Sequence, residues 1–332
     1  MKNLSLIITL LVVIVTACTN PKSKEKNIAS APLEVKKTQA YIGLKEGGEW
    51  KWVTKNNGNE QYEYQGGSFK SVSQLNVDEK HTDHSFDIQF EGPGWESDKI
   101  AYRIYLDWRN AIDIFGKKTD TTVLHSVGLD GFDSYHEVAD WGVDVLKVGS
   151  SLGMGSIAFW DGEKAIRVEK TDSLFAKVKN DETKSEVAIT YYGWEINNTK
   201  TTLQSTLAIE AGSYLTRYTH TLSETLPNLA SGIVKHDNTE VKVFTDIKEG
   251  WTCLASFGVQ TLQNDKLGMC VFVKTDQLIE HTSDSYSEVL VMKPENKELR
   301  YYFGAAWEQD ASGVSSMDDF KALLVEQAAF IQ

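Results

Sequence analysis

Cysteine and proline are scarce in this chain, which has three cysteines and five prolines among 332 residues. So few cysteines exclude a scaffold held together by several disulfides and a zinc module with four cysteine ligands. We find no glycine-rich phosphate loop, no paired-histidine zinc motif and no serine elbow. The enzyme classes that depend on those motifs are therefore not indicated.

Positive charge is also in the minority. The chain has 34 Lys+Arg against 47 Asp+Glu, which gives a formal net charge of −13. A protein with this charge is a poor candidate for binding nucleic acid through its general field. The remaining composition, 41% hydrophobic and 24% charged, is that of an ordinary globular protein.

The first 18 residues have the pattern of a bacterial lipoprotein signal peptide. Lys2 precedes an apolar run from 4 to 15, which is too short to cross a bilayer, and the small residues before Cys18 resemble a lipobox. We therefore predict lipidation at Cys18, with an ordinary signal peptide as the alternative. Residues 19–40 are polar and rich in lysine, and they are predicted to be a flexible tether. The expected location is lipid-anchored at the bacterial membrane, periplasmic or at the cell surface.

Past the tether, apolar and polar residues alternate with the period of a β-strand in many short segments. Glycine, asparagine, aspartate and serine separate these segments, and no amphipathic helix lies between them. Strands are expected at 49–53, 99–105, 186–192, 201–209, 213–222, 240–245, 268–273, 287–292 and 298–303.

Only the end of the chain has helical spacing. Ser316 is a candidate N-cap, with acids in the following turn, and apolar residues recur with helical spacing from Phe320 to Phe330. We therefore predict that residues 41–332 form one large antiparallel β-sandwich or super-sandwich with a C-terminal helix. Two stacked β domains are the structural alternative.

Residues with chemical potential are concentrated between positions 94 and 162. His136 lies beside Tyr135 in a loop-like stretch, and Trp141 follows shortly after. Loops on a rigid β scaffold commonly carry functional sites. Aromatic side chains beside acids and amides are also what a sugar requires, namely flat apolar faces and partners for hydroxyl groups.

The five arginines are few enough to compare individually. Arginine matches a carboxylate in a bidentate geometry, so an acidic protein that binds an acid has to concentrate these side chains. Arg103 and Arg217 are our candidates, although a solvated strand face is the simpler interpretation of Arg103. His236 follows an apolar run and has Lys235 beside it, which suggests a site at a strand end or an exposed turn.

The other histidines and the last two cysteines give weaker signals. His81 and His84 lie in polar stretches, and we predict no function for them. Cys253 and Cys270 lie in neighbouring apolar segments. They could form a disulfide across a hairpin or remain as buried thiols, and the sequence leaves both options open.

Several segments together resemble a family of bacterial lipoproteins. The family was long known only as a domain of unknown function. It is common in polysaccharide-utilisation gene clusters and includes an oligosaccharide dehydratase of ulvan breakdown. The similarity runs from about residue 85 to the C-terminus. The segments that carry it lie at 95–103, 135–137, 141–149, 158–162 and 231–236.

The resemblance implies that the substrate is an oligosaccharide with a uronic acid at its non-reducing end. Loss of the C5 proton and of the C4 hydroxyl as water would give a 4,5-unsaturated uronate. This reaction needs a base, an acid and groups that neutralise the carboxylate. On this basis His136 is the predicted base and Tyr135 or His236 the acid, with base and acid exchangeable. Arg103 and Arg217, helped by Lys147, would hold the carboxylate, and Trp141 would contact the sugar.

No cofactor is required by this hypothesis, although a divalent cation could take the place of an arginine. Oxygen ligands for such an ion could come from Glu96, Asp98, Asp113 and Asp144. Two other functions stay open. The protein could be a non-catalytic glycan-binding lipoprotein, or an epimerase or isomerase acting at the same C5 hydrogen. A glycan-binding protein would use tryptophans as stacking platforms, with Trp95, Trp141, Trp160 and Trp194 as candidates.

Overall fold

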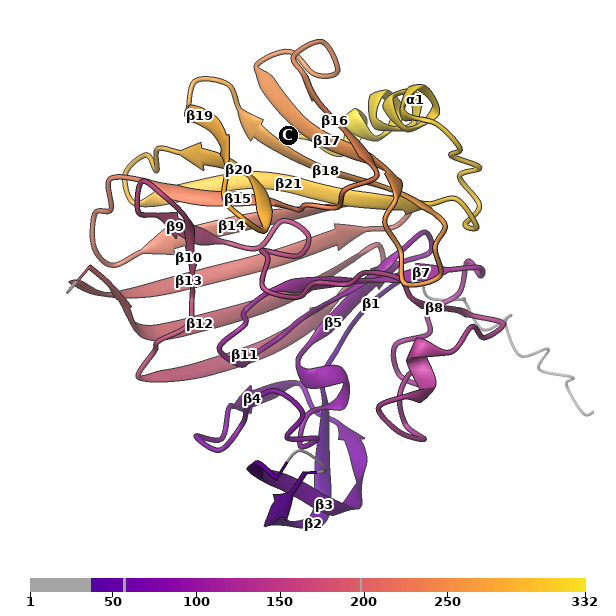
Figure 1. Ribbon diagram of the computed structural model, residues 1–332, viewed down its shortest axis with the longest axis vertical. Helices are drawn as coiled ribbons and strands as arrows, with labels where there is room; N and C mark the ends of the chain where they lie inside the picture. Colours follow the sequence, from indigo (N-terminus) through magenta and orange to yellow (C-terminus); the bar gives the residue numbers. More distant parts are fainter. Residues whose placement is uncertain (1–36, 56–57, 198) are drawn as a thin grey trace, which may run out of the picture. The chain divides into compact units, whose positions relative to one another are not determined.

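The computed structural model describes residues 37–55, 58–197 and 199–332 (Figure 1). Strands dominate it, and every pairing between named strands is antiparallel, which confirms the predicted fold class. The described residues belong to a single compact unit, Val35–Gln332. The predicted signal peptide and the lipidation site Cys18 lie outside the described residues.

The first sheet has five strands in the order β1-β5-β6-β7-β8. Their bounds are Thr38–Tyr41 (β1), Gly94–Ser97 (β5), Ala101–Ile104 (β6), Ile112–Lys117 (β7) and Gly142–Asp144 (β8). Strand β1 pairs along its whole length with β5. Residues 38–40 therefore belong to the domain and not to the tether, because the ladder and the burial of Thr38 and Ala40 fix them.

The second sheet has nine strands in the order β16-β17-β18-β21-β14-β13-β12-β11-β4. Their bounds are Thr239–Phe244 (β16), Trp251–Val259 (β17), Lys266–Lys274 (β18), Glu298–Trp307 (β21), Leu215–Leu222 (β14), Thr199–Glu210 (β13), Lys184–Ile196 (β12), Ser173–Asn180 (β11) and Gln74–Asn76 (β4). Most of the strands expected from alternation lie in this sheet, often longer than predicted.

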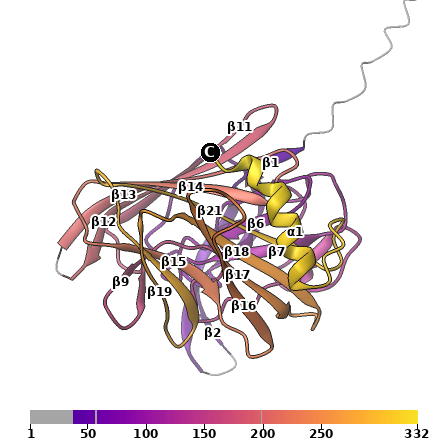
Figure 2. The ribbon, with the colours of Figure 1, turned by 90° about the horizontal axis from the view of Figure 1, so that it is seen from above.

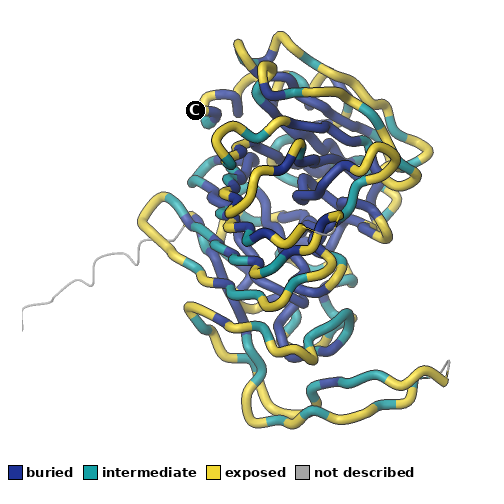
Figure 3. Tube along the Cα trace, turned by 90° about the vertical axis from the view of Figure 1, so that its left-hand side faces the viewer, coloured by how far each residue is buried: buried dark blue, intermediate teal, exposed yellow. Residues whose placement is uncertain are grey.

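A third sheet has the order β10-β9-β15-β20-β19, and β2 and β3 pair only with each other. The bounds are Ala165–Arg167 (β10), Ala158–Trp160 (β9), Leu229–Val234 (β15), Ser287–Met292 (β20), Leu278–Ser283 (β19), Gly43–Thr54 (β2) and Glu60–Ser71 (β3). Exposed residues are frequent along the β2–β3 hairpin, whereas the centres of the larger sheets are buried (Figure 3).

The helical elements are few among the described residues. The helix α1 covers Met317–Gln327, and short 3-10 turns cover Gln89–Glu91 (η1), Ser134–His136 (η2) and Ala328–Phe330 (η3). The hydroxyl of Ser316 accepts a hydrogen bond from the backbone N–H of Asp319, as the predicted N-cap requires. Phe320 packs 6.1 Å from Phe257, which fixes α1 against β17 (Figure 2). No described helix is long and apolar enough to cross a membrane.

The main core lies between the first sheet and the nine-stranded sheet. Trp95 donates a hydrogen bond from Nε1 to the Thr216 hydroxyl at 2.8 Å, and the ring of Tyr102 lies 5.6 Å from that of Phe303. Trp95, Trp160 and Trp194 are all buried, so they pack the interior and do not offer stacking surfaces for a sugar. Of the four tryptophans considered, only Trp141 is partly exposed.

Strand alternation gives the first sheet a second buried face of different character. Tyr102 and Ile104 face the main core, so Arg103 between them faces the other way. In the ladder Arg103 lies opposite Asp113, and Asp144 lies opposite Phe115. The charged side chains of three neighbouring strands therefore meet on one face, beneath the segment that contains η2.

Cys253 and Cys270 are buried free thiols, which decides between the two options that the sequence left open.

Candidate active site

The guanidinium of Arg103 lies at the centre of the polar face of the first sheet. Its Nη2 donates to Asp113 at 2.7 Å and to Asp144 at 2.6 Å, and its Nε also donates to Asp113. Its Nη1 donates to the Tyr135 hydroxyl at 3.1 Å and to the Phe90 carbonyl at 3.4 Å. Every nitrogen of Arg103 thus has a partner inside the protein, so this guanidinium has no nitrogen left for a substrate carboxylate. Its predicted role as a carboxylate clamp does not fit the structure.

Three carboxylates surround the single positive charge of Arg103, since Glu91 also lies 3.8 Å from Nη1. Burial and the neighbouring Asp113 raise the pKa of Asp144 well above its usual value. The Tyr105 hydroxyl also donates to Asp113 at 2.5 Å. Asp144 is therefore the acid of this cluster that most readily holds a proton.

His136 lies at the edge of this cluster with one third of its side chain exposed. Its Nδ1 is 3.2 Å from the Phe132 carbonyl, which can only accept, so Nδ1 carries the hydrogen and Nε2 is the unprotonated nitrogen of the neutral ring. Burial and the charge of Arg103 lower the pKa of His136. Nε2 lies 3.5 Å from Asp144, which would stabilise the ring once it gained a proton.

Tyr135 adjoins His136, with ring centroids 4.6 Å apart. Because its oxygen accepts from Arg103, its own hydrogen is free to be donated elsewhere. Burial raises the pKa of Tyr135, so the hydroxyl is protonated at neutral pH. Trp141 reaches the same cluster through Phe115, at a centroid distance of 5.9 Å. The structure therefore brings together four of the predicted site residues: Arg103, Tyr135, His136 and Trp141.

A cavity of about 690 Å³ opens beside Tyr135. The base of the β2–β3 hairpin forms one wall, η1 and the preceding loop form a second, and the loop at 128–132 forms a third. Two lysines line it, and neither has an ion-pair partner within 4.0 Å among the described residues: Lys45 and Lys70. Burial lowers the pKa of Lys45, and its Nζ lies 5.3 Å from the ring of Phe69.

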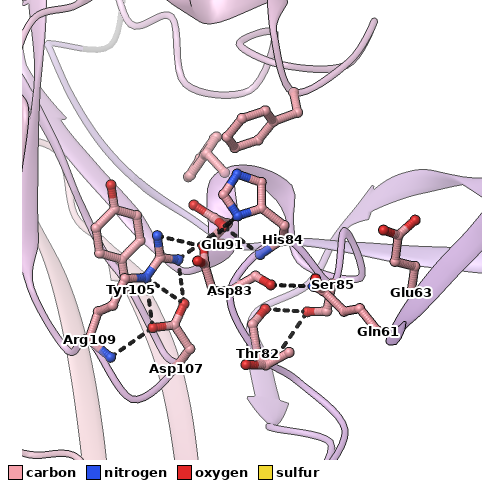
Figure 4. A network of polar contacts seen from close by, with 12 residues as sticks. Gln61, Glu63, Thr82, Asp83, His84, Ser85, Glu91, Tyr105, Asp107 and Arg109 are labelled. Carbon is pink, nitrogen blue, oxygen red and sulfur yellow. Dashed lines mark hydrogen bonds and ion pairs between the residues drawn. The ribbon is translucent and has the colours of Figure 1, made fainter. Parts of the chain in front are cut away.

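A network of ion pairs adjoins this cavity (Figure 4). Arg109 donates from Nη2 to Glu91 at 3.0 Å and also pairs with Asp107 through the same nitrogen. Its Nη1 is 2.8 Å from Asp83, whose carboxylate is also 2.6 Å from Nδ1 of His84. The hydrogen bond to Asp83 raises the pKa of His84. The rings of His84 and His136 both lie near the ring of Phe132, at centroid distances of 4.5 Å and 5.0 Å.

The segment that carries this network is backbone-strained. His84, Phe86, Phe90 and Glu91 all have positive φ angles, between 42° and 69°. Non-glycine residues rarely adopt this region, and such strain concentrates at functional sites. Phe86, Phe90 and Glu91 line the cavity, so the strained backbone shapes the proposed binding surface.

Three predicted site residues lie elsewhere. Thr216 points into the core toward Trp95, so its neighbour Arg217 lies on the opposite face of β14 and lines a small hollow with Phe330. Lys147 is exposed, and its charge helps burial to lower the pKa of His236. Among the described residues, no hydrogen bond, ion pair or ring contact joins His236, Lys147 or Arg217 to Arg103 or His136. Alternation shows which residues of a strand share a face, but it does not show what packs against that face. The sequence therefore could not show that Arg217 lies away from Arg103 and His136.

The predicted oxygen ligands for a cation do not form one set. Glu96 binds the buried Lys117 at 2.8 Å, and Asp98 pairs with Lys99 at 3.3 Å, whereas Asp113 and Asp144 share Arg103. Within the described ranges, the group with metal-like spacing is Asp83, His84 and Glu91. Both carboxylates of this group, Asp83 and Glu91, already form ion pairs with Arg109.

Sequence reasoning missed His84, Arg109 and Lys45. The two histidines at 81 and 84, spaced around Thr82 and Asp83, were a usable signal, but a polar stretch without periodicity gives no indication of burial. Lys45 lies in a strand-like segment far from the residues at 94–162. Only the hairpin places it at the cavity.

The comparisons with known proteins are sparse. No curated protein matches the chain significantly. Among solved structures, 4-alpha-glucanotransferase from Thermococcus litoralis is similar with 10% sequence identity and a TM-score of 0.30. The match covers 71% of this chain and 40% of the glucanotransferase chain, and so weak a likeness carries no argument about function. A family model described as "Domain of unknown function (DUF4861)" matches residues 17–332, and the chain therefore belongs to that family.

Proposed function

We propose that this protein is a carbohydrate dehydratase, a carbon–oxygen lyase that removes water from the non-reducing-end uronate of an oligosaccharide during the breakdown of an ulvan-like algal polysaccharide. One observation carries the proposal. The protonated Tyr135 lines a cavity that also contains aromatic rings and two lysines, and His136, unprotonated at Nε2, lies directly beside Tyr135. Adjacent groups whose environments favour opposite protonation states are the usual sign of an acid–base pair.

His136 is the proposed base that removes the C5 hydrogen. Its Nδ1 hydrogen is held by the Phe132 carbonyl, so the lone pair is on Nε2. When Nε2 takes the proton, the new imidazolium lies 3.5 Å from an Asp144 oxygen, which can accept its hydrogen. The protonated state that the reaction creates is therefore stabilised in advance.

Tyr135 is the proposed acid that protonates the leaving C4 hydroxyl. Its phenolate, once formed, would lie 3.1 Å from the Arg103 Nη1. Arg103 is therefore a positioning residue, which orients the phenol, stabilises the phenolate and aligns Asp144 with His136.

Lys45 is the proposed partner of the substrate carboxylate, with the nearby Lys70 as a second cation. Both line the cavity and lack an ion pair within the described part of the chain. The proton on C5 is acidic only if the negative charge that develops on the carboxylate is neutralised. His84, whose pKa is raised by its hydrogen bond to Asp83, lies beside Phe132 on the same side.

The reaction balances without an added reagent. The C5–H electrons form the C4=C5 double bond, the C4–O bond breaks, and the hydroxyl leaves with the Tyr135 proton as water. His136 then holds the C5 proton and Tyr135 is a phenolate. Return of one proton from the imidazolium to the phenolate restores both groups.

The test is to mix the purified protein with uronate-ended oligosaccharides and to follow ultraviolet absorbance and product mass. A dehydratase gives an absorbing product lighter by about 18 Da, the mass of one water. The variant His136→Ala should lose this activity, whereas His125→Ala, a matched change at an exposed histidine, should keep it.

Other results would reject the proposal in distinct ways. Binding without a change in mass would identify a glycan-binding protein. Altered stereochemistry with unchanged mass would identify an epimerase or isomerase. Full activity in His136→Ala would remove this residue from the mechanism.

The same proposal includes the location of the protein. We propose that Cys18 is lipidated and anchors the domain at the bacterial membrane, periplasmic or at the cell surface, since the residues before it resemble a lipobox. Metabolic labelling with a fatty acid should mark the wild-type chain and not Cys18→Ser. Equal labelling of both chains would reject the anchor.

A further inference from the structure

A second cavity, also of about 690 Å³, is lined in part by Asp107, an ion-pair partner of Arg109. It is formed by three segments, 77–82, 106–108 and 168–174. Arg109 joins the two cavities, because it binds Glu91, which lines the first, and Asp107, which lines the second (Figure 4). One guanidinium nitrogen of Arg109 therefore links a lining residue of each cavity, which brings the two linings close together at this point.

The second cavity contains an exposed tryptophan on a well-anchored loop. Trp108 has 49% of its surface exposed, which is unusual for so large an apolar side chain. The residues around it are fixed. The Asp107 carboxylate accepts from the backbone N–H of Arg109 at 2.8 Å, and the buried Asn110 donates to the Tyr191 hydroxyl at 3.0 Å. The guanidinium of Arg167 lies 5.3 Å from the Trp108 ring.

Such an arrangement offers a preformed flat surface. An anchored indole loses little conformational entropy when a ligand stacks on it, and its apolar face suits the C–H face of a sugar ring. Carboxylates and hydroxyls around the ring, from Thr82, Glu169 and Thr171, supply the hydrogen-bond partners that sugar hydroxyls need.

The charges of the lining select between kinds of sugar. Two charged groups are already balanced, since Asp107 pairs with Arg109 and His81 pairs with Asp87 at 2.8 Å. Three further acids of the lining pair with cations outside it: Asp78 with Lys80 at 3.7 Å, Glu169 with Arg167 at 3.5 Å and Asp172 with Lys200 at 2.6 Å. The other two charged residues of the lining, Glu79 and Lys170, have opposite charges. The lining therefore has no excess of positive charge to hold a uronate or a sulfate, whereas neutral hydroxyls can donate to its carboxylates.

We infer that this second cavity is a subsite for a neutral glycosyl unit of the same oligosaccharide whose uronate end occupies the first cavity. The inference rests on the proposed function for the identity of the ligand. It adds a specificity: the substrate carries an uncharged sugar near the terminal uronate, stacked on Trp108.

The test compares binding of a short and a long ligand by calorimetry. The probes are a uronate-ended disaccharide and a uronate-ended tetrasaccharide with neutral internal sugars, each titrated into the wild type, Trp108→Ala and Trp108→Phe. Trp52→Ala is the matched control, because Trp52 is also exposed and lines neither cavity. Trp108→Ala should weaken the tetrasaccharide roughly threefold to tenfold, the range expected for one stacking contact. Disaccharide binding should not change, and Trp108→Phe should recover part of the loss.

Each alternative result overturns the inference. Equal weakening of both ligands, or no weakening of either, excludes a separate subsite. Weakening by Trp52→Ala of the same size shows that the loss is not specific to this cavity. Turnover is scored separately with the disaccharide. If the wild type binds it without releasing water, the proposed function fails, while the difference between ligand lengths still decides the subsite.

Discussion

Removal of the central cation of the cluster gives the sharpest stability prediction. Arg103 is 2% exposed and is the cation that contacts both Asp113 and Asp144, which are 1% exposed. Arg103→Met keeps much of the side-chain volume but leaves two buried carboxylates without this partner. Breaking a buried pair in this way typically costs about 3–5 kcal/mol of unfolding free energy, which is a large part of the stability of most domains.

The loss should depend on pH, and the sign follows from linkage. Without Arg103, the pKa of Asp144 rises further in the folded state, while in the unfolded chain it stays near about 3.9. The folded variant then binds more protons than the unfolded one, so its stability increases as pH falls through the raised pKa of Asp144. Each extra proton bound changes the unfolding free energy by about 1.4 kcal/mol per pH unit. The deficit relative to wild type should therefore shrink by about 1–3 kcal/mol between pH 7 and pH 5.

Urea unfolding at both pH values measures this effect. Arg300→Met at an exposed position is the matched control and should cost less than about 0.5 kcal/mol. Adding Asp113→Asn and Asp144→Asn to Arg103→Met should restore part of the stability at pH 7. A loss that is the same at both pH values, or no larger than that of Arg300→Met, would refute the electrostatic reasoning.

Three further predictions concern titration and binding. The pKa of His136 is lowered, so kcat/KM should rise with pH through a midpoint below about 6.5 and, with Tyr135 as the acid, stay high past pH 9; a fall in kcat/KM below pH 9 would exclude Tyr135 as the acid. Burial lowers the pKa of His220 to about 3, so its contribution to stability is complete above about 6.5 and is lost as pH falls. His220→Gln should flatten the slope of unfolding free energy against pH between 6.5 and 5, worth about 2 kcal/mol, and an unchanged slope compared with His125→Gln would contradict this. Lys45→Met should raise KM for a uronate-ended disaccharide roughly tenfold without affecting binding of a neutral oligosaccharide, and equal losses for both would show that Lys45 does not act on the carboxylate.

Much of the fold could be predicted from the sequence because its signals are local. Alternation along 186–192 and 201–209 reports which residues face a core, and these segments lie in β12 and β13. The N-cap at Ser316 depends only on its own side chain and the next turn, and it forms as expected. Within the site, the adjacency of Tyr135 and His136 is also a local fact, and the structure keeps both at the cluster.

Tertiary structure alone decided which charges meet. Arg103 and Arg217 look alike as strand residues with a polar side chain. Arg103 faces the side of the first sheet that the segment with Tyr135 covers, whereas Arg217 faces the side of the nine-stranded sheet that is turned away from the main core. The surroundings of each arginine depend on what packs against its strand. The donors of Arg103 are satisfied by Asp113 and Asp144 from two other strands, which removed it from substrate binding. Lys45 reaches its cavity through the β2–β3 hairpin, and Trp108 reaches its cavity on a loop anchored to Tyr191. Contacts of long sequence separation, rather than local pattern, therefore define where a ligand can bind.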